Sequence, residues 1–282
     1  MSHGLDLALI QTRTPATAVA GLAHVEPLVR QAAAAGAKFI LTPEGVNRLE
    51  QRRGRREIGL TEEDQDACVI GLRHLAAELG VWLLIGSAIV RSGHVGDARA
   101  ANRSLLIDAN GGIVSRYDKL HVFDVDLANG ETYRESATIR PGDGAGIADT
   151  PWGRLGLTVC YDLRFPHLFR QLAKAGACMI AVPAAFTVPT GEAHWETLLR
   201  ARAIETGAFV LAPAQGGTHE DGRKTWGHSL VVGPWGEVIA RLDHDAPGVL
   251  HATLDLSKVE AARAAVPQLR HDREFAPPGA AA

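Results

Sequence analysis

The feature that most limits the fold of this chain is an alternation of strand and helix patterns that occurs twice. Short apolar runs typical of buried strands are separated by longer amphipathic patterns typical of helices. The first series has strand patterns at 5–11, 38–42 and 81–90, and helix patterns at 17–35 and 62–79. The second has strand patterns at 155–160, 178–182 and 209–213, and helix patterns at 166–175 and 193–205. Strands that alternate with helices predict an α/β fold with parallel central strands.

Hairpin patterns follow each series. The strand patterns 103–108 and 113–119 flank Asn110-Gly111-Gly112, a sequence typical of a tight turn. After the second series come a hairpin pattern at 229–242, a strand pattern at 248–254 and a helix that starts near Ser257. Hairpins would add antiparallel strands at sheet edges, so we predict one α/β domain with a mixed sheet. This domain is expected to span 1–275, and 276–282 to form a flexible tail.

Composition narrows the class of protein. Of the 282 residues, 46% are hydrophobic and 22% are charged, as in an ordinary soluble globular protein. The net charge of −3 provides no field that would attract nucleic acid or an anionic membrane. The exception is the basic run Arg52-Arg53-Gly54-Arg55-Arg56, which is either a solvated loop or an anion-attracting rim. No stretch is long enough to span a bilayer, and the N-terminus lacks the apolar core of a signal peptide.

The three cysteines include no C-x-x-C pair, so they suit neither a disulfide framework nor a zinc knuckle. Together with the missing signal peptide, they predict a reducing, cytoplasmic location. One of them, Cys160, lies at the end of a strand pattern, just before the helix that Pro166 opens. Open α/β folds bind ligands at this edge of the sheet, where backbone N–H groups could lower the thiol pKa or hold an oxyanion. The alternative is a buried, inert thiol.

Two charged residues lie where they could share a cleft with Cys160. Glu44 follows the strand pattern 38–42, and Lys119 ends the second strand of the first hairpin. A thiol, a carboxylate and an ammonium group suit acyl transfer, as nucleophile, proton acceptor and oxyanion-stabilising cation. Each charged residue, taken alone, is equally compatible with a solvated surface position.

Other catalytic motifs are incomplete. Gly227-His228-Ser229-Leu230-Val231 lacks the last glycine of a nucleophile elbow and lies in a strand-like run. No phosphate-binding loop is present, and the glycines at 142–146 do not lead from a strand into a helix.

Four separated motifs make the chain resemble the nitrilase superfamily of carbon–nitrogen hydrolases over nearly its whole length. They are Leu41-Thr42-Pro43-Glu44-Gly45, Tyr117-Asp118-Lys119-Leu120-His121, Val159-Cys160-Tyr161-Asp162-Leu163-Arg164-Phe165-Pro166 and the segment 226–236. Each motif is modest alone, but their order and spacing are highly specific. The helix pattern 193–206 is closest to the Nit branch of amidases, and within it to the Nit1-like group.

The resemblance implies a fold, a site and an assembly. The fold would be a four-layer α-β-β-α sandwich with mixed sheets. Glu44 would be the general base, Lys119 the stabilising cation and Cys160 the nucleophile, while Glu135 would position the substrate and the lysine. Tyr161, through its backbone N–H, and Arg164, through its guanidinium, are the further substrate-positioning candidates; a structural ion pair is an equally good role for Arg164. A homodimer is expected, built partly on helix 193–206, with 266–273 reaching toward the partner.

The expected reaction needs no metal or cofactor. Lys119 and turn N–H groups would stabilise a Cys160 thiolate, which attacks an amide; Glu44 would protonate the leaving nitrogen, as ammonia from a primary amide, and then activate water. The implied substrate is a small linear ω-amide with a distant carboxylate, above all deaminated glutathione. The alternatives are 2-oxoglutaramate, a carbamoyl amine or a nitrile. A non-catalytic binding scaffold and an ammonia-supplying glutaminase module are the alternatives of other kinds.

Overall fold

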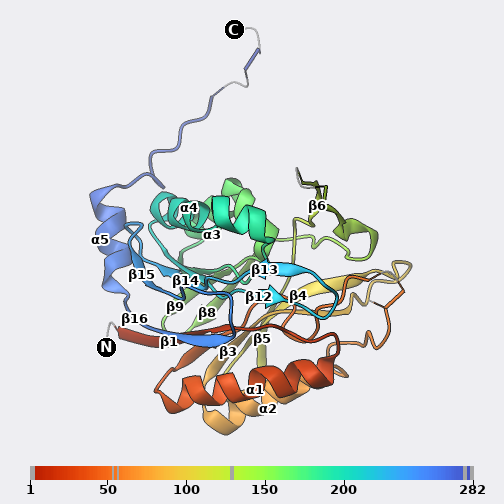
Figure 1. Cartoon of the computed structure of the whole chain (residues 1–282). Coiled ribbons are helices and arrows are strands. Elements are labelled where there is room, and N and C mark those ends of the chain that lie inside the picture. The colour runs from red at the N-terminus through yellow and green to blue at the C-terminus, as the bar shows by residue number, and fades with distance from the viewer. Residues whose placement is uncertain (1–3, 53, 56, 128–129, 276–277, 280–282) are drawn as a thin grey trace.

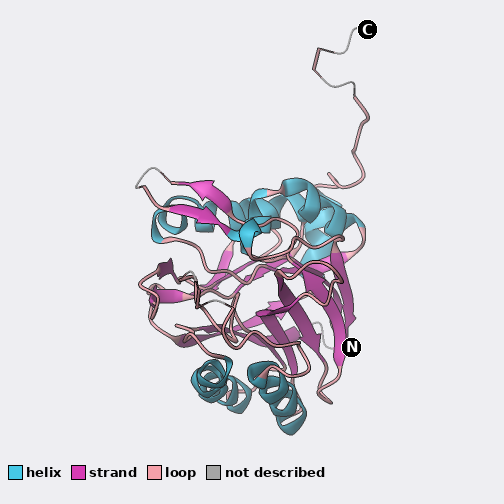
Figure 2. Cartoon of the chain, turned by 90° about the vertical axis from the view of Figure 1, so that its right-hand side faces the viewer, coloured by secondary structure: helices cyan, strands magenta, loops and turns pink. Residues whose placement is uncertain are grey.

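Two mixed β-sheets lie face to face at the centre of the molecule, and pairs of helices cover their outer faces (Figures 1 and 2). The computed structural model describes residues 4–52, 54–55, 57–127, 130–275 and 278–279. Most of the expected tail, 276–282, therefore lies outside the described residues. Residues 271–275 lead away from the body of the molecule in both views.

The first sheet has six strands in the order β16-β1-β2-β3-β4-β5. β1, β2 and β3 are parallel neighbours, and antiparallel strands extend the sheet on both sides. The bounds of these strands are β1 Gly4–Gln11, β2 Phe39–Leu41, β3 Trp82–Arg91, β4 Ala100–Ile107, β5 Ile113–Asp118 and β16 Gly248–Asp255.

The second sheet repeats this plan in the order β15-β14-β11-β10-β9-β8. Its parallel neighbours are β9, β10 and β11, with antiparallel strands again on both sides. The bounds are β8 Gly146–Thr150, β9 Gly153–Leu157, β10 Ala177–Ala181, β11 Phe209–Ala212, β14 Leu230–Val232 and β15 Val238–Arg241. Two short hairpins lie outside the sheets: β6 (Asp124–Asp126) with β7 (Thr132–Arg134), and β12 (Gly216–Thr218) with β13 (Lys224–Trp226).

The helices form the outer layers. α1 (Ala18–Ala34) and α2 (Ala67–Leu79) cover the first sheet, and α3 (Pro166–Lys174) and α4 (Val188–Thr206) cover the second (Figure 1). α5 (Ser257–Ala265) runs along one side. The four-layer α-β-β-α sandwich is therefore confirmed. The single mixed sheet predicted from the strand patterns was wrong, because each series of strands builds its own sheet.

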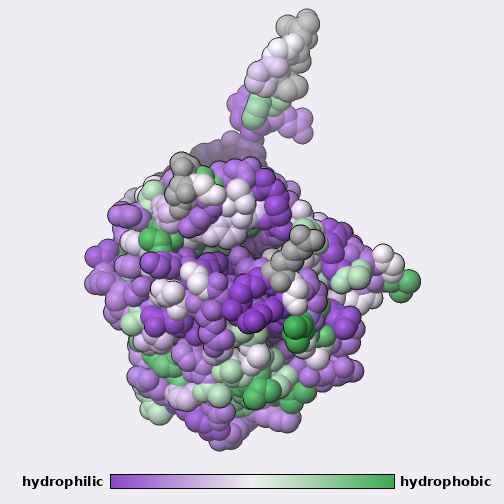
Figure 3. All heavy atoms as spheres, turned by 45° about the vertical axis from the view of Figure 1, so that its right-hand side comes forward, coloured by the Kyte–Doolittle hydropathy of each residue, from purple (hydrophilic) through white to green (hydrophobic). Residues whose placement is uncertain are grey.

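Apolar residues on both faces of the strands explain why the strand patterns are continuous rather than alternating. In β1, Leu7 and Leu9 join the core cluster that contains the second sheet, whereas Ala8 and Ile10 join the cluster under α1 and α2. All four are buried. A sheet covered on both faces needs an apolar residue at every position. No helix of the described residues has the length and apolar character to cross a membrane, and hydrophilic residues predominate on the face in Figure 3.

Several element boundaries differ from those predicted, including those of α2, α4 and β9. α2 begins at Ala67 rather than at 62, because the Asp66 carboxylate caps it by accepting from the N–H groups of Cys68 and Val69. α4 begins at Val188 rather than at 193, since a proline is tolerated in its first turn. β9 ends at Leu157, so that the expected strand residues 158–160 belong to the turn that follows.

Gly86 of β3 allows the loops that follow strands of both sheets to meet. A Cβ atom at this position would lie 1.9 Å from the carbonyl oxygen of Thr42 and 2.5 Å from the Cβ of Pro183. Thr42 follows β2 of the first sheet, and Pro183 follows β10 of the second. A side chain here would push apart the segments that connect the two halves.

We expect Gly86→Ala to lower the free energy of unfolding by about 1–3 kcal/mol, because backbone atoms have to move to admit a methyl group. Urea denaturation measures this loss. Gly144→Ala is the matched control, since a Cβ there meets nothing within 4 Å, and its effect should stay within about 0.5 kcal/mol. Equal stability of Gly86→Ala and wild type would contradict this account of the junction.

Candidate active site

Cys160 lies on a strained turn at the junction of the two sheets. It begins η2 (Cys160–Arg164), a 3-10 turn between β9 and α3, and its backbone φ is 51°. Left-handed backbone is unfavourable for a residue with a side chain and is typical of functional positions. The Cys160 N–H donates to the Pro183 carbonyl at 2.9 Å, which ties the turn to the segment after β10.

Asp162 holds this turn in place, a role that the sequence analysis missed. Its carboxylate is fully buried and accepts hydrogen bonds from the Val159 N–H at 2.8 Å and the Tyr117 hydroxyl at 2.7 Å. It also accepts from the His121 N–H at 3.0 Å. Tyr117 and His121 flank Lys119, so Asp162 connects the Lys119 segment to the Cys160 turn.

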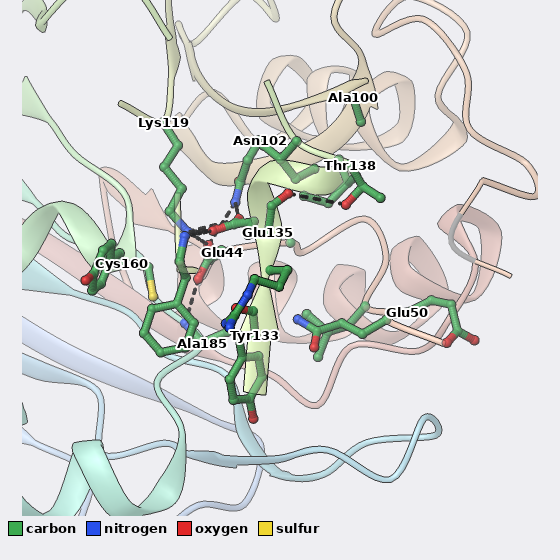
Figure 4. Close-up of a pocket in the computed structure, with 18 of the residues that line it drawn as sticks. Glu44, Glu50, Ala100, Asn102, Lys119, Tyr133, Glu135, Thr138, Cys160 and Ala185 are labelled. Carbon is green, nitrogen blue, oxygen red and sulfur yellow. Dashed lines mark hydrogen bonds and ion pairs between the residues drawn. The ribbon is translucent and has the colours of Figure 1, made fainter. Parts of the chain in front are cut away.

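Glu44 comes from the first half of the chain, in the loop after β2. Its Oε2 atom accepts from the Ala185 N–H at 2.9 Å, a group of the second half. Its Oε1 atom accepts from the Lys119 ammonium at 2.9 Å and from the Asn102 amide at 2.8 Å (Figure 4). The carboxylate is therefore held in one orientation across the junction, and it is 7% exposed.

Lys119 lies between two carboxylates. Besides Glu44, its ammonium donates to both oxygens of Glu135, at 3.1 and 2.9 Å. Glu135 begins a short 3-10 turn after β7, and its Oε2 atom also accepts from the Phe123 N–H at 2.6 Å. Lys119 is 2% exposed, so this ammonium is shielded from water and its position is set by the two glutamates.

Asn102 is a second residue that sequence reasoning missed. Its amide nitrogen donates to Glu44 at 2.8 Å and to Glu135 at 3.2 Å, and so links the two carboxylates that hold Lys119. Its amide oxygen is buried without a partner. The sequence offered no signal for it: Asn102 precedes the strand pattern predicted at 103–108, whereas the structure places it inside β4, where it is buried.

The charges of Lys119 and Glu44 stabilise each other. Burial by itself would lower the pKa of Lys119, but the carboxylates of Glu135 and Glu44 outweigh it and raise the pKa well above its ordinary value. Burial would raise the pKa of Glu44, yet the Lys119 charge and the hydrogen bonds from Cys160, Lys119 and Asn102 lower it overall. The ammonium and the carboxylate are therefore both ionised at neutral pH.

The thiol of Cys160 behaves differently from our expectation. Burial and the negative charge of Glu44 raise its pKa well above the ordinary value, against the opposing effects of Lys119 and the Ala185 N–H. The suggestion that the turn lowers this pKa was wrong, because a buried thiol beside a carboxylate disfavours the thiolate. The resting pair is a neutral thiol and an ionised Glu44.

These side chains face a cavity of about 470 Å³, within the range that holds a small organic ligand. Figure 4 shows the Cys160 sulfur beside the cluster formed by Glu44, Lys119 and Glu135. Tyr161 also lines the cavity, and its ring packs edge-on against Phe123 and Phe165. The cavity thus brings together every site residue predicted from the sequence.

Arg164 lines the same cavity. Its guanidinium lies over the Phe186 ring and contacts His194 Nδ1 at 3.2 Å. The alternative of a structural ion pair was wrong, because no carboxylate of the described residues pairs with Arg164. Of the basic run, Arg53 and Arg56 lie outside the described residues. Arg52 pairs with Glu50, and neither Arg52 nor Arg55 lines the cavity.

Histidine, cysteine and acidic side chains of the described residues form no group that could hold a metal ion. All three cysteines are free thiols. Cys68 is buried in α2, and Cys178 is half-buried in β10, away from the cavity.

Comparison with known proteins gives the chain its relatives. The carbon–nitrogen hydrolase family model matches residues 6–264. A deaminated glutathione amidase from Yersinia enterocolitica is 41% identical over 95% of this chain and 93% of its own length. The crystal structure of the Caenorhabditis elegans NitFhit protein aligns with a TM-score of 0.87 and 33% identity, over 96% of this chain and 66% of that one.

A third relative bears on the cysteine. A variant of the amidase from Nesterenkonia sp. AN1, with acrylamide added at its active-site cysteine, aligns with a TM-score of 0.75 and 26% identity. The alignment covers 94% of this chain and 98% of that one. On the extent of the family match and the identity to curated relatives, this chain belongs to the carbon–nitrogen hydrolase family.

Proposed function

We propose that the chain is an amidase that hydrolyses deaminated glutathione to 2-oxoglutarate and cysteinylglycine through a thioester on Cys160. The observation that carries this proposal is a neutral thiol beside an ionised, fully hydrogen-bonded Glu44 in a ligand-sized cavity. The substrate is proposed from the Yersinia enterocolitica relative, whose name carries this activity. Carboxylate recognition by Arg164 agrees with it, because that guanidinium has no acidic partner.

Thiol and carboxylate would react in concert rather than as a preformed ion pair. As the Cys160 sulfur bonds to the amide carbon, Glu44 takes the thiol proton. The carbonyl oxygen becomes an oxyanion, which the Lys119 ammonium and the Tyr161 N–H stabilise. Glu44 then gives its proton to the leaving nitrogen, the C–N bond breaks and a thioester remains. For deaminated glutathione the leaving group is the amine of cysteinylglycine, rather than the ammonia that a primary amide releases.

Hydrolysis of the thioester uses the same groups. Glu44, again ionised, takes a proton from water while the water oxygen attacks the thioester carbon. The tetrahedral intermediate collapses, the C–S bond breaks and the sulfur takes the proton back from Glu44. Glu135 and Asn102 act as positioning residues, since they hold Lys119 and Glu44. Glu135 also lines the cavity, where it would position the substrate. Three free thiols agree with a reducing, cytoplasmic location.

A substrate panel tests this function. We expect kcat/KM to be highest for deaminated glutathione, lower for 2-oxoglutaramate and lowest for carbamoyl amines and nitriles. Cys160→Ala should abolish turnover of every substrate while circular dichroism stays that of wild type; Cys178→Ala is the matched control and should stay active. A preference for nitriles or carbamoyl amines would overturn the substrate, and turnover by a folded Cys160→Ala protein would overturn the mechanism.

The pKa directions predict the pH dependence. Because its pKa is lowered from the ordinary 4.5, Glu44 stays ionised down to a pH below 4.5. Because its pKa is raised from the ordinary 9.0, the Cys160 thiol stays neutral up to a pH above 9.0. The reactive pair is thus present between these limits, so we expect kcat/KM to be flat from about pH 5 to about pH 8.5.

Iodoacetamide provides a second readout of the thiol. Without substrate, alkylation of Cys160 should accelerate only above pH 9.0, the ordinary thiol value. In Glu44→Gln the acceleration should move to lower pH, because the charge that opposes the thiolate is gone. An activity that rises through pH 7–8 together with alkylation would mean that the thiolate is the resting form.

The expected homodimer remains a proposal, but the structure does not support the contact surface expected from the sequence. The apolar stripe of α4 is not available to a partner, since Trp195, Leu199 and Ala203 are buried against the chain's own core. Gln268, in the segment 266–273, donates to the Ile204 carbonyl of its own chain. The better support is a group of exposed apolar side chains around the end of α4: Ile204, Trp235 and Val266.

Light scattering at micromolar concentration should give twice the chain mass of 30.0 kDa. Trp235→Glu should shift the mass toward the monomer, because it places a charge in the proposed apolar contact. Val95→Glu, at an exposed loop distant from α4, is the control and should remain dimeric. A monomeric wild-type protein would refute the dimer.

A further inference from the structure

Arg223 belongs to a hairpin that the mechanism above does not use. It lies in the turn between β12 and β13 and lines the cavity. Its N–H donates to the Asp221 carboxylate at 3.0 Å, and its carbonyl accepts from the His219 N–H at 2.8 Å. The backbone that carries this guanidinium is therefore held in one conformation.

The Arg223 side chain has no partner among the described residues. Its Nε and Nη2 atoms are shielded from water and donate to no acceptor. Unsatisfied buried donors of a charged group are costly, and native structures usually provide an acceptor. Turning this guanidinium toward a ligand would break no hydrogen bond, so an incoming acceptor meets little resistance.

The unpaired edge has the geometry that binds a carboxylate. Arg103 uses the same two nitrogens to hold Asp118, with Nε and Nη2 at 2.7 and 2.9 Å from the two oxygens. Arg99 holds Asp97 in the same manner, at 3.0 and 2.7 Å. Two parallel N–H groups match the two oxygens of a carboxylate. The same edge of Arg223 holds no carboxylate among the described residues, and the side chain has to turn for this edge to meet a ligand, because both nitrogens are shielded from water.

Among the arginines that line the cavity, Arg223 and Arg164 differ from the others. Arg99 and Arg134 are occupied by Asp97 and Asp126, and Arg48 donates to backbone carbonyls. Arg164 follows Cys160 on the same turn, η2, close to the nucleophile.

The Arg223 hairpin contacts a part of the cavity wall that comes from the first half of the chain. Asp221 accepts from the Gln51 N–H at 3.1 Å, and Figure 4 shows the neighbouring Glu50 on the far side of Glu44 from Cys160. Arg164 and Arg223 therefore line the cavity from two different elements: Arg164 from the turn that carries Cys160, and Arg223 from the hairpin that contacts Gln51.

We propose that Arg223 binds the carboxylate of the leaving amine while Arg164 binds the carboxylate of the acyl group. The preferred substrate class is then a linear amide with a carboxylate on each side of the scissile bond. This inference rests on the proposed function, because deaminated glutathione has an oxo-acid carboxylate on one side and a glycyl carboxylate on the other. An amide that releases only ammonia would leave Arg223 unpaired.

The test compares two substrates that differ only in the leaving-group carboxylate. They are deaminated glutathione and its analogue with a C-terminal carboxamide. We expect the wild-type enzyme to lose roughly 10- to 100-fold in kcat/KM with the carboxamide, the range for removing a charged hydrogen-bonded pair. With the acid, Arg223→Gln should lower kcat/KM by a similar factor relative to wild type. With the carboxamide, the same substitution should lower kcat/KM by a few-fold at most, because that substrate already lacks the carboxylate that Arg223 would bind.

Two further variants separate the fork from the charge and from the hairpin. Arg223→Lys keeps the charge but not the paired N–H groups, and should recover only part of the loss with the acid. Lys224→Gln removes the neighbouring, exposed charge of the same hairpin and should match wild type with both substrates. The melting temperature of each variant shows whether the hairpin stays folded.

The outcomes distinguish the two proposals. A wild-type enzyme that hydrolyses neither substrate nor 2-oxoglutaramate refutes the proposed function itself. If the wild-type enzyme hydrolyses deaminated glutathione and its carboxamide analogue equally well, the Arg223 inference is overturned and the proposed function stands. This comparison uses the wild-type enzyme, so it does not depend on whether a variant folds. An equal loss in Arg223→Gln for acid and carboxamide also overturns it, since the arginine would then act on the fold rather than on the carboxylate.

Discussion

The buried ammonium of Lys119, held by Glu44 and Glu135, is the interaction on which the rest of the site depends. A lysine removed from water loses its charge unless carboxylates compensate it, and here two do so with Asn102 as a bridge between them. The same arrangement keeps Glu44 ionised in a buried position. Without the lysine, burial would favour the protonated form of Glu44, and the carboxylate could not accept a proton from Cys160.

This cluster exists only where the two halves of the fold meet. Glu44, Asn102 and Lys119 belong to the first series of elements, whereas Cys160 and Ala185 belong to the second. Backbone contacts such as Cys160 to Pro183 hold the proposed nucleophile, and the Ala185 N–H holds Glu44 from the opposite half. Close packing at Gly86 lets these loops approach. The contacts that stabilise the junction are therefore the contacts that set the geometry of the site.

Charge also organises the space around the cluster. Of the described arginines that line the cavity, Arg99 and Arg134 are neutralised by neighbouring aspartates. Arg48 donates to backbone carbonyls, whereas Arg164 and Arg223 have neither a carboxylate nor a backbone carbonyl as partner among the described residues, and they give the cavity a positive character from two different elements. A ligand with separated carboxylates would compensate both charges, whereas a neutral amide would compensate neither. Selectivity in such a cavity depends on which guanidiniums the protein leaves unpaired, rather than on how many it contains.

The sequence by itself predicted the α/β class and, through its resemblance to a known family, the four layers and the three proposed reacting groups. Short apolar runs that alternate with helix patterns indicated parallel strands, and the motifs around Glu44, Lys119 and Cys160 indicated the chemistry. The separation into two sheets was not readable from the strands, because pairing between strands is a tertiary choice. The roles of Asn102 and Asp162, the raised thiol pKa and the unpaired edge of Arg223 were also decided by tertiary structure. Each depends on burial and on partners distant in sequence, and residue spacing does not encode either.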